Sequence, residues 1–220
     1  MKNQHLFDGQ RMRMDEAIVL TTESLRHYGK RYQHWAIAYS GGADSSATAT
    51  LVSHLIETGK VPAPRSLTIL YADTRMELPP LQISALEVLR ALAARGAETR
   101  VVLPEMDHRY FVYMFGRGVP PPSNLFRWCT PKLKVYPMLS ALREYRERVG
   151  EKFLMLTGVR LGESAVRDQR IAMSCSRDGA ECGQGWFQET TPEHIADTLS
   201  PLINWRVCHV RDWLMFDAPS

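Results

Sequence analysis

Residues 35–52 read WAIAYSGGADSSATATLV, and this stretch decides how the rest of the chain is interpreted. An apolar run ends at Tyr39 and is followed by a serine, two glycines and a segment with helical character. Glycine has no Cβ, so it allows a sharp turn and lets a ligand approach the backbone amides closely. The pattern predicts a buried strand at residues 34–39, a tight turn, and a helix at residues 43–58.

The same alternation of short apolar strands and helices continues along the chain. Further strands are expected at residues 66–73, 98–104 and 152–159, and further helices at residues 14–28, 79–95, 107–115 and 131–149. Such an order predicts βαβ units and an α/β fold, an open parallel sheet with flanking helices. We expect one α/β domain at residues 1–170. Residues 171–220 show little periodicity and are expected to form an irregular lobe packed on that domain.

Composition sets broad limits on the function. The chain has 220 residues, of which 45% are hydrophobic, and a net charge of +3, which is compatible with a polyanionic partner without requiring one. No apolar run approaches the ~20 residues that span a bilayer, and the N-terminus has no secretory signal pattern. We therefore expect a cytoplasmic protein, in which four cysteines are thiols or metal ligands.

The turn after the first strand has the residues of a phosphate site. Backbone amides and the hydroxyls of Ser40, Ser45 and Ser46 can donate to phosphate oxygens, and the following helix adds its positive N-terminus. Asp44 does not favour a bare phosphate, so its presence indicates a bound Mg²⁺. The alternative is a tight turn without a ligand. The string is neither a Walker A motif nor Gly-x-Gly-x-x-Gly.

The segment SGGADSS, residues 40–46, resembles the PP-loop of the ATP pyrophosphatases, which have the adenine nucleotide α-hydrolase-like fold. The resemblance implies that ATP is cleaved between its α and β phosphates and that the substrate is adenylated, with Asp44 and Ser45 as catalytic residues. The residues implied to hold the nucleotide are Ser40, Gly41, Gly42, Asp44, Ser45 and Ser46. Asp73, at the end of the second strand, falls where the family contacts the nucleotide; its alternative role is to cap a turn.

A second motif follows the fourth strand. Residues 158–170 read GVRLGESAVRDQR and resemble the Gly-x-Arg-x-x-Glu-Ser segment of the phosphoadenosine phosphosulfate (PAPS) reductase branch. Arg160 and Arg167 are suited to phosphate because a guanidinium fork matches its oxygens. Arg160 is also a candidate catalytic residue, and Glu163 is expected to orient an arginine or to cap the helix. A solvated helix face is the alternative for Arg167.

The cysteines carry the remaining prediction of a metal. They are Cys129, Cys175, Cys182 and Cys208, and no C-x-x-C pair occurs among them. Unrelated core thiols are one interpretation. The other is a metal site, because a lobe without a periodic core gains stability from a bound metal.

The combination of SGGADS, FRWCTPKLK, GVRLGES and CSRDGAECGQGWF resembles the DndC and SspD type sulfurtransferases of DNA phosphorothioation. That resemblance implies a [4Fe–4S] cluster on all four cysteines and adenylation of a DNA backbone phosphate before sulfur replaces one oxygen. It also implies a cysteine desulfurase and other phosphorothioation proteins as partners. Two departures stand out: Ala43 replaces a lysine of many relatives, and the chain ends earlier than the longer members.

Contacts to DNA are expected from cations interleaved with aromatic residues. The candidates are Arg109, Arg117, Arg127 and Lys132, with Tyr110, Tyr113, Phe126 and Trp128 between them. Lys132 and Lys134 are further candidates for neutralising phosphate charge; the alternative for both is a solvated helix face, and for the aromatic residues a place in the core. Competing functions are a PAPS or adenosine phosphosulfate reductase, a tRNA-thiolating enzyme, and an assembly subunit without catalytic activity.

Overall fold

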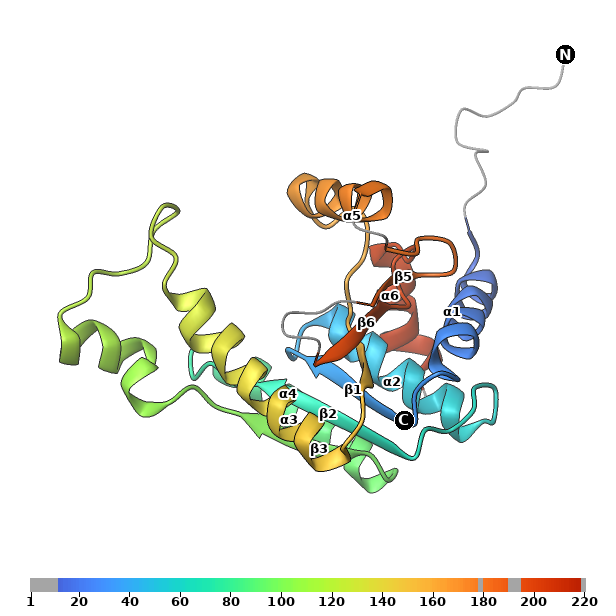
Figure 1. The fold of residues 1–220 in the computed structure, drawn as a ribbon, viewed down its shortest axis with the longest axis horizontal. Helices are drawn as coiled ribbons and strands as arrows, with labels where there is room; N and C mark the ends of the chain where they lie inside the picture. Colours follow the sequence, from blue (N-terminus) through green and yellow to red (C-terminus); the bar gives the residue numbers. More distant parts are fainter. Residues whose placement is uncertain (1–11, 178–179, 190–194, 219–220) are drawn as a thin grey trace, which may run out of the picture.

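The computed structural model describes residues 12–177, 180–189 and 195–218. Six strands form one sheet in the order β3-β2-β1-β4-β6-β5, parallel except for β5, which pairs antiparallel with β6 (Figure 1). The strands are β1 His34–Tyr39, β2 Ser66–Ala72, β3 Glu98–Val102, β4 Phe153–Leu156, β5 Trp186–Gln188 and β6 Ala196–Ser200. The predicted fold class, an open and mostly parallel sheet with flanking helices, is confirmed.

Helices cover both faces of the sheet. The α-helices are α1 Met14–Gly29, α2 Ala43–Glu57, α3 Pro79–Ala94, α4 Tyr136–Val149, α5 Ala165–Arg177 and α6 Val207–Asp212. The shorter helical turns are η1 Met106–His108, η2 Val112–Gly116, η3 Pro131–Val135 and η5 Trp213–Asp217. Residues 107–115, predicted as one helix, are thus divided between η1 and η2. Among the described residues, no helix is both long enough and apolar enough to cross a bilayer.

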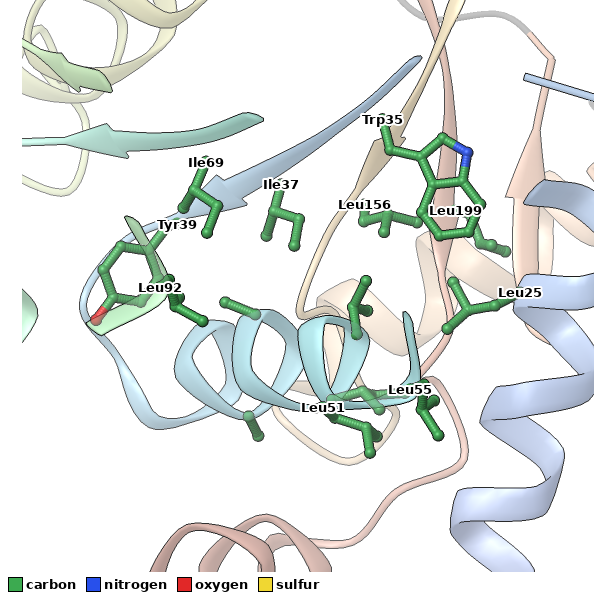
Figure 2. Close-up of a cluster of buried hydrophobic side chains, with 14 of the residues drawn as sticks. Leu25, Trp35, Ile37, Tyr39, Leu51, Leu55, Ile69, Leu92, Leu156 and Leu199 are labelled. Carbon is green, nitrogen blue, oxygen red and sulfur yellow. The ribbon is translucent and has the colours of Figure 1, made fainter. Parts of the chain in front are cut away.

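Side chains of β1 alternate between two cores, as the period of a strand requires. Trp35 and Ile37 point to one face, where they pack with α1, α2, α3 and α6, and Figure 2 shows Ile37 above the α2 side chains. Ala36 points to the other face and packs with Tyr145 of α4. Helices α2 and α3 therefore lie on one face and α4 on the other. Strands β1, β2 and β3 follow one another toward one edge of the sheet, whereas β4 lies on the other side of β1, so the strand order changes direction between the neighbours β1 and β4.

The residues beyond 170 differ from the expected irregular lobe. Strands β5 and β6 extend the sheet, and Leu199, Trp205 and Trp213 belong to the same core as β1. The sequence pattern does not predict β6, because all five of its residues, ADTLS, are buried although three of them are polar. Asp197 is accommodated because its carboxylate accepts a hydrogen bond from the Tyr32 hydroxyl and pairs with Lys152. Residues 178–179, 190–194 and 219–220 of the predicted lobe lie outside the described residues.

Candidate active site

The turn after β1 is closed by its own serine side chains. Gly41 has a φ of +77°, and a Cβ at this position would lie 2.9 Å from the Cβ of Ala85, so glycine is required on two counts. The Ser45 hydroxyl donates to the Gly42 carbonyl and accepts the Ser40 amide at 3.2 Å. These bonds hold the loop in a single shape before any ligand arrives.

Helix α2 begins without a side-chain cap. Its N-cap is Gly42, which has no side chain that could accept the amides of the first turn, and Ser46 makes the first intrahelical bond to the Gly42 carbonyl. Uncapped amides and the positive end of the helix dipole favour an anion at this position. The loop that was predicted to bind phosphate therefore leads into a helix start with uncapped backbone amides, which are suitable donors for phosphate oxygens.

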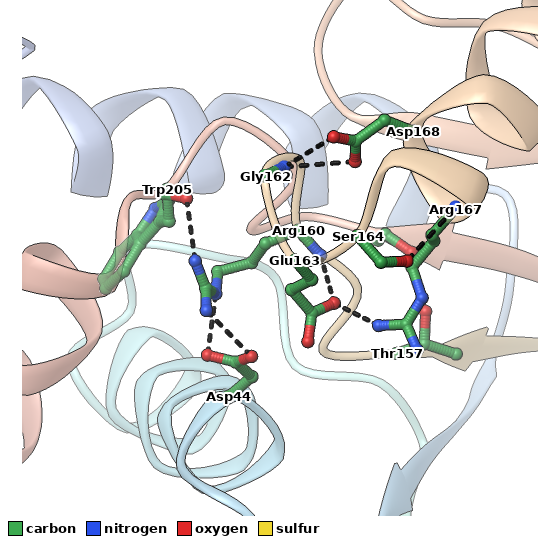
Figure 3. Close-up of polar contacts among 10 residues, drawn as sticks. Asp44, Thr157, Arg160, Gly162, Glu163, Ser164, Arg167, Asp168 and Trp205 are labelled. Atoms are coloured by element: carbon green, nitrogen blue, oxygen red, sulfur yellow. Dashed lines mark hydrogen bonds and ion pairs between the residues drawn. The ribbon is translucent and has the colours of Figure 1, made fainter.

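Arg160 and Asp44 join the two sequence motifs. Arg160 donates from Nε and Nη2 to the two carboxylate oxygens of Asp44, at 2.7 and 3.0 Å, and its Nη1 contacts the Trp205 carbonyl (Figure 3). The arginine is only 8% exposed, so this bidentate pair is largely shielded from water. Both groups were predicted to face the nucleotide, but in this structure each one neutralises the other.

Gly158 brings the chain after β4 against the backbone of α2. A Cβ at Gly158 would lie 2.8 Å from the Asp44 carbonyl carbon and 2.9 Å from the Ser45 amide nitrogen. Real Cβ atoms do not approach backbone so closely, so only glycine fits unless the backbone shifts. The first residue of the second motif is thus part of the packing of the first motif.

A cavity of about 450 Å³ opens between the two motifs. It lies beyond the carboxyl ends of β1 and β4, the point where the chain changes direction across the sheet, and open α/β sheets bind ligands at such points. Its lining comes from the end of β1, the turn after it and the start of α2, from the loop after β4 and the start of α5, and from α6: Ala38, Ser40, Gly42, Ala43, Asp44, Ser45, Gly158, Val159, Arg160, Glu163, Arg167, Val207, Val210 and Arg211.

Two further arginines face this cavity. Arg167 pairs with Glu163, and the turn between them is held by Asp168, which accepts the Gly162 amide at 3.0 and 3.1 Å. Arg211 is exposed and, within the described part of the chain, forms no ion pair. Arg211 is not predictable from the sequence, because it belongs to no motif and reaches the site only through the packing of α6.

Three of the predicted nucleotide contacts, Gly41, Ser46 and Asp73, lie outside the cavity lining. Ser46 is buried and its hydroxyl donates to Tyr39. Asp73 accepts the Arg75 amide at 2.8 Å and the Gln82 side chain at 3.0 Å, and Arg75 has a φ of +60°. Asp73 therefore holds a strained turn, which was the alternative interpretation of this residue. A direct contact of any of the three with a nucleotide stays a prediction.

Tyr71 lies beneath the loop and remains a neutral side chain. Its ring carbon Cε2 would be 3.6 Å from a Cβ at Gly41, and its hydroxyl has no hydrogen-bond partner in the described structure. Burial, and next the negative charge of Asp73, raise the pKa of Tyr71 to about 12. The hydroxyl therefore keeps its proton at neutral pH.

The four cysteines do not form a common ligand set in this structure. Cys175 of α5 and Cys182 are joined in a disulfide, whereas Cys129 and Cys208 are free. Among the described residues, no group of three or more Cys, His, Asp or Glu side chains is arranged to hold a metal ion. The arrangement does not fit the predicted [4Fe–4S] cluster, which stays a prediction from the resemblance. The environment of Asp44 likewise does not fit the predicted Mg²⁺, since Arg160 already neutralises the Asp44 carboxylate.

Residues 34–217 match the phosphoadenosine phosphosulfate reductase domain family. The chain belongs to this family. The match runs from the first residue of β1 to the last residue of η5 and includes both motifs and the cavity between them. No curated protein sequence matches the chain.

Solved structures with the same fold are remote in sequence. PAPS reductase from Candida auris, in a phosphate complex, is 14% identical with a TM-score of 0.56, over 96% of this chain and 88% of that one. The U34-tRNA thiolase NcsA from Methanococcus maripaludis, with its [4Fe-4S] cluster, is 15% identical with a TM-score of 0.54, over 93% and 64%. FMN adenylyltransferase from Candida glabrata, in complex with FMN and the ATP analog AMPCPP, is 14% identical with a TM-score of 0.57, over 96% and 60%.

These similarities establish the PP-loop fold of the chain. The chain spans less than two thirds of the thiolase and of the adenylyltransferase. The predicted superfamily is confirmed, and the finer assignment to DNA phosphorothioation rests on the sequence resemblance.

Proposed function

We propose that the chain is an ATP pyrophosphatase that binds ATP in the cavity between its two motifs and transfers the adenylyl group to an acceptor. The observation that carries this proposal is the junction of the motifs: Gly158 packs on the backbone of Asp44 and Ser45, and Arg160 holds the Asp44 carboxylate. This junction fixes the uncapped start of α2 at the mouth of a cavity large enough for a triphosphate.

Each group then has a distinct task. The loop amides and the N-terminus of α2 hold the leaving pyrophosphate, because they are donors fixed in place before the reaction. Arg211 and Arg167 balance the charge that develops on the phosphates. Arg160 acts through Asp44, as a positioning residue for the first turn of α2. Magnesium enters with ATP as part of the substrate.

We propose a DNA backbone phosphate as the acceptor, on the sequence resemblance of the FRWCTPKLK segment and the second motif. A non-bridging phosphate oxygen attacks the α-phosphorus of ATP, and pyrophosphate leaves. A thiol reductant releases the sulfur as sulfide from the persulfide of the donor and is itself oxidised to a disulfide; the sulfide then attacks the activated DNA phosphorus, and AMP leaves with the original oxygen. The donor is supplied by a cysteine desulfurase, and other phosphorothioation proteins complete the system in the cytoplasm. No step is assigned to a cluster, because the cysteines are not assembled for one.

The test follows the fate of ATP labelled on its α-phosphorus. The full chain with MgATP, DNA and sulfide should convert the label to AMP and release an equal amount of pyrophosphate. Asp44→Asn and Arg160→Lys should each lower this rate about 100-fold, since each breaks the bidentate pair. Arg90→Ala, an exposed cation on α3, is the control and should leave the rate unchanged. Release of γ-phosphate alone, or no ATP cleavage by the wild type, contradicts the proposal and favours an assembly subunit.

A second candidate function, reduction of a sulfonucleotide, is favoured by the family itself and by one local feature. Cys182 lies in the sequence ECG, is exposed, and is bonded to Cys175. Two thiols that give two electrons to a sulfonucleotide end as a disulfide. This candidate predicts consumption of PAPS with a thiol donor and without ATP, and loss of that activity in Cys182→Ser. The two assays on the same preparation separate the two functions.

A further inference from the structure

Residues 106–135, here called the basic arm, project away from the sheet between β3 and α4 (Figure 1). The arm contains η1, η2 and η3 and leaves the sheet at the carboxyl end of β3. In a parallel sheet this is the same edge as the loops after β1 and β4. A ligand on the arm is therefore on the same side of the molecule as the proposed ATP site.

The arm concentrates the positive charge of the whole chain. Its cations are Arg109, Arg117, Arg127, Lys132 and Lys134, and its single acidic residue is Asp107, which pairs with Arg117 at 2.6 Å. Five cations and one anion give the arm a net charge of +4, whereas the chain as a whole has +3. The rest of the protein therefore carries −1, and a polyanion is attracted to the arm rather than to the surface in general.

One set of aromatic residues holds the arm together. The Trp128 ring lies 5.4 Å from that of Tyr110 and 4.7 Å from that of Tyr113. Trp128 is 7% exposed and its indole N–H donates to the Pro120 carbonyl. The ammonium of Lys132 lies 4.7 Å from the centre of the Tyr113 ring. Three of the aromatic residues predicted to contact DNA are thus mainly structural.

A second set of aromatic residues is exposed to solvent. Phe111 is 57% exposed, Phe115 77% and Phe126 46%. The rings of Phe111 and Phe115 are nearly parallel, with an angle of 3° between their planes and 6.0 Å between their centres. Exposed flat rings on a segment rich in cations are the arrangement with which proteins stack unpaired bases.

We propose that the basic arm binds single-stranded DNA, with Phe111, Phe115 and Phe126 stacking on bases and Arg127 and Lys134 contacting phosphates. The bases of a duplex cannot stack on these rings, because their faces are already stacked on one another. The inference rests on the proposed function, which makes a DNA phosphate the acceptor, and it defines the form of DNA that is bound.

A cavity at the root of the arm connects it to the body of the protein. This cavity, of about 470 Å³, lies between the loop after β2 and the arm, and it is lined by Thr74, Met76, Glu77, Tyr110, Cys129, Thr130, Leu133 and Lys134. A strand bound along the arm can therefore continue from Lys134 toward the loops at the carboxyl edge of the sheet.

Fluorescence anisotropy with the full chain tests the proposal. A labelled 20-nucleotide single strand should bind more tightly than the duplex of the same sequence. Phe115→Ala combined with Phe111→Ala should weaken single-strand binding about 10-fold or more. Arg127→Ala or Lys134→Ala should lower the slope of log Kd against log salt by about one. Matched controls are Phe216→Ala, an exposed aromatic residue outside the arm, and Arg90→Ala; neither should change binding.

Three outcomes overturn the inference. The first is equal or tighter binding of the duplex, and the second is unchanged single-strand binding in the double phenylalanine variant. The third is a wild type that has no affinity for DNA and forms a dimer, which the double variant converts to a monomer. Circular dichroism of each variant verifies that the fold is retained. Failure of the proposed function is separate, since it appears as absent pyrophosphate release while the arm variants still lose DNA binding.

Discussion

Gly158 is the residue at which the two motifs meet, because it has no side chain to separate them. The Cα of Gly158 lies so close to the carbonyl of Asp44 and the amide of Ser45 that even a methyl group does not fit between them. The neighbouring ion pair between Arg160 and Asp44 depends on this approach, since a guanidinium reaches both carboxylate oxygens only over a narrow range of positions. One hydrogen atom in place of a methyl group thus sets the geometry of the site.

Gly158→Ala should therefore impair both ATP turnover and stability. The added methyl group has to displace backbone atoms, so we expect a loss of about 1–3 kcal/mol in the free energy of unfolding and at least a 10-fold rise in the KM for ATP. Gly183→Ala is the matched control, because nothing lies within 4 Å of the Cβ it would add. Urea unfolding and steady-state kinetics measure the two effects, and equal behaviour of the two variants would contradict the proposed junction.

At the scale of elements, strands were predictable where apolar residues mark them. Strand β1 was predicted with its observed bounds, His34–Tyr39, because a continuous run of buried apolar and aromatic residues leads into a glycine turn. Strand β6 was not, because burial of Asp197 depends on Tyr32 and Lys152, which are distant in sequence. The two motifs of the site were likewise readable as local strings, whereas Arg211 needed the packing of α6.

The junction of β3 and α4 is expected to depend on pH. Glu98 of β3 accepts two hydrogen bonds from Arg148 of α4 and one from Thr68 of β2 at 3.0 Å. The bonds from Arg148, and then the bond from Thr68, hold the pKa of Glu98 below its ordinary value, although burial opposes this shift. A lowered pKa in the folded state stabilises the fold above the unfolded-state pKa of about 4.3, and that contribution is lost as the pH falls through the folded-state pKa.

Glu98→Gln should accordingly lower the free energy of unfolding at pH 7 by about 0.5–1 kcal/mol, a modest amount because both partners are partly exposed to solvent. The difference from the wild type should shrink as the pH drops below about 4. Urea titrations at pH 7 and at pH 3 measure this change. Glu87→Gln, an exposed residue of α3, is the control and should match the wild type at both values. A constant deficit across this range would assign the effect to packing instead of charge.

For the whole molecule, the residues beyond 170 complete the core that the first half of the chain begins. Trp213 of η5 is 2% exposed and its indole N–H donates to Thr50 of α2 at 2.9 Å. Helix α2, which follows the phosphate loop, is thus packed against η5, the last described helical turn. The same helix contributes to both the binding site and the core.

Trp213→Ala should destabilise the whole protein by about 3–5 kcal/mol, because it leaves a large cavity against α2. Phe216→Ala on the same helical turn should change stability by less than about 0.5 kcal/mol, since that ring is 80% exposed. Thermal unfolding followed by circular dichroism compares the two. A separate early transition in Trp213→Ala, with the remainder melting as in the wild type, would show instead that residues 171–220 fold independently.

The strand order also has a consequence for biosynthesis. Central strand β1 pairs on one side with β2, which follows soon after it, but on the other side with β4, where Trp35 lies opposite Leu154. While the nascent chain leaves the ribosome, β1 has an open edge and an uncovered apolar face until most of the protein has been made. During translation this unfinished sheet is a binding surface for chaperones and the part of the chain most prone to misassembly.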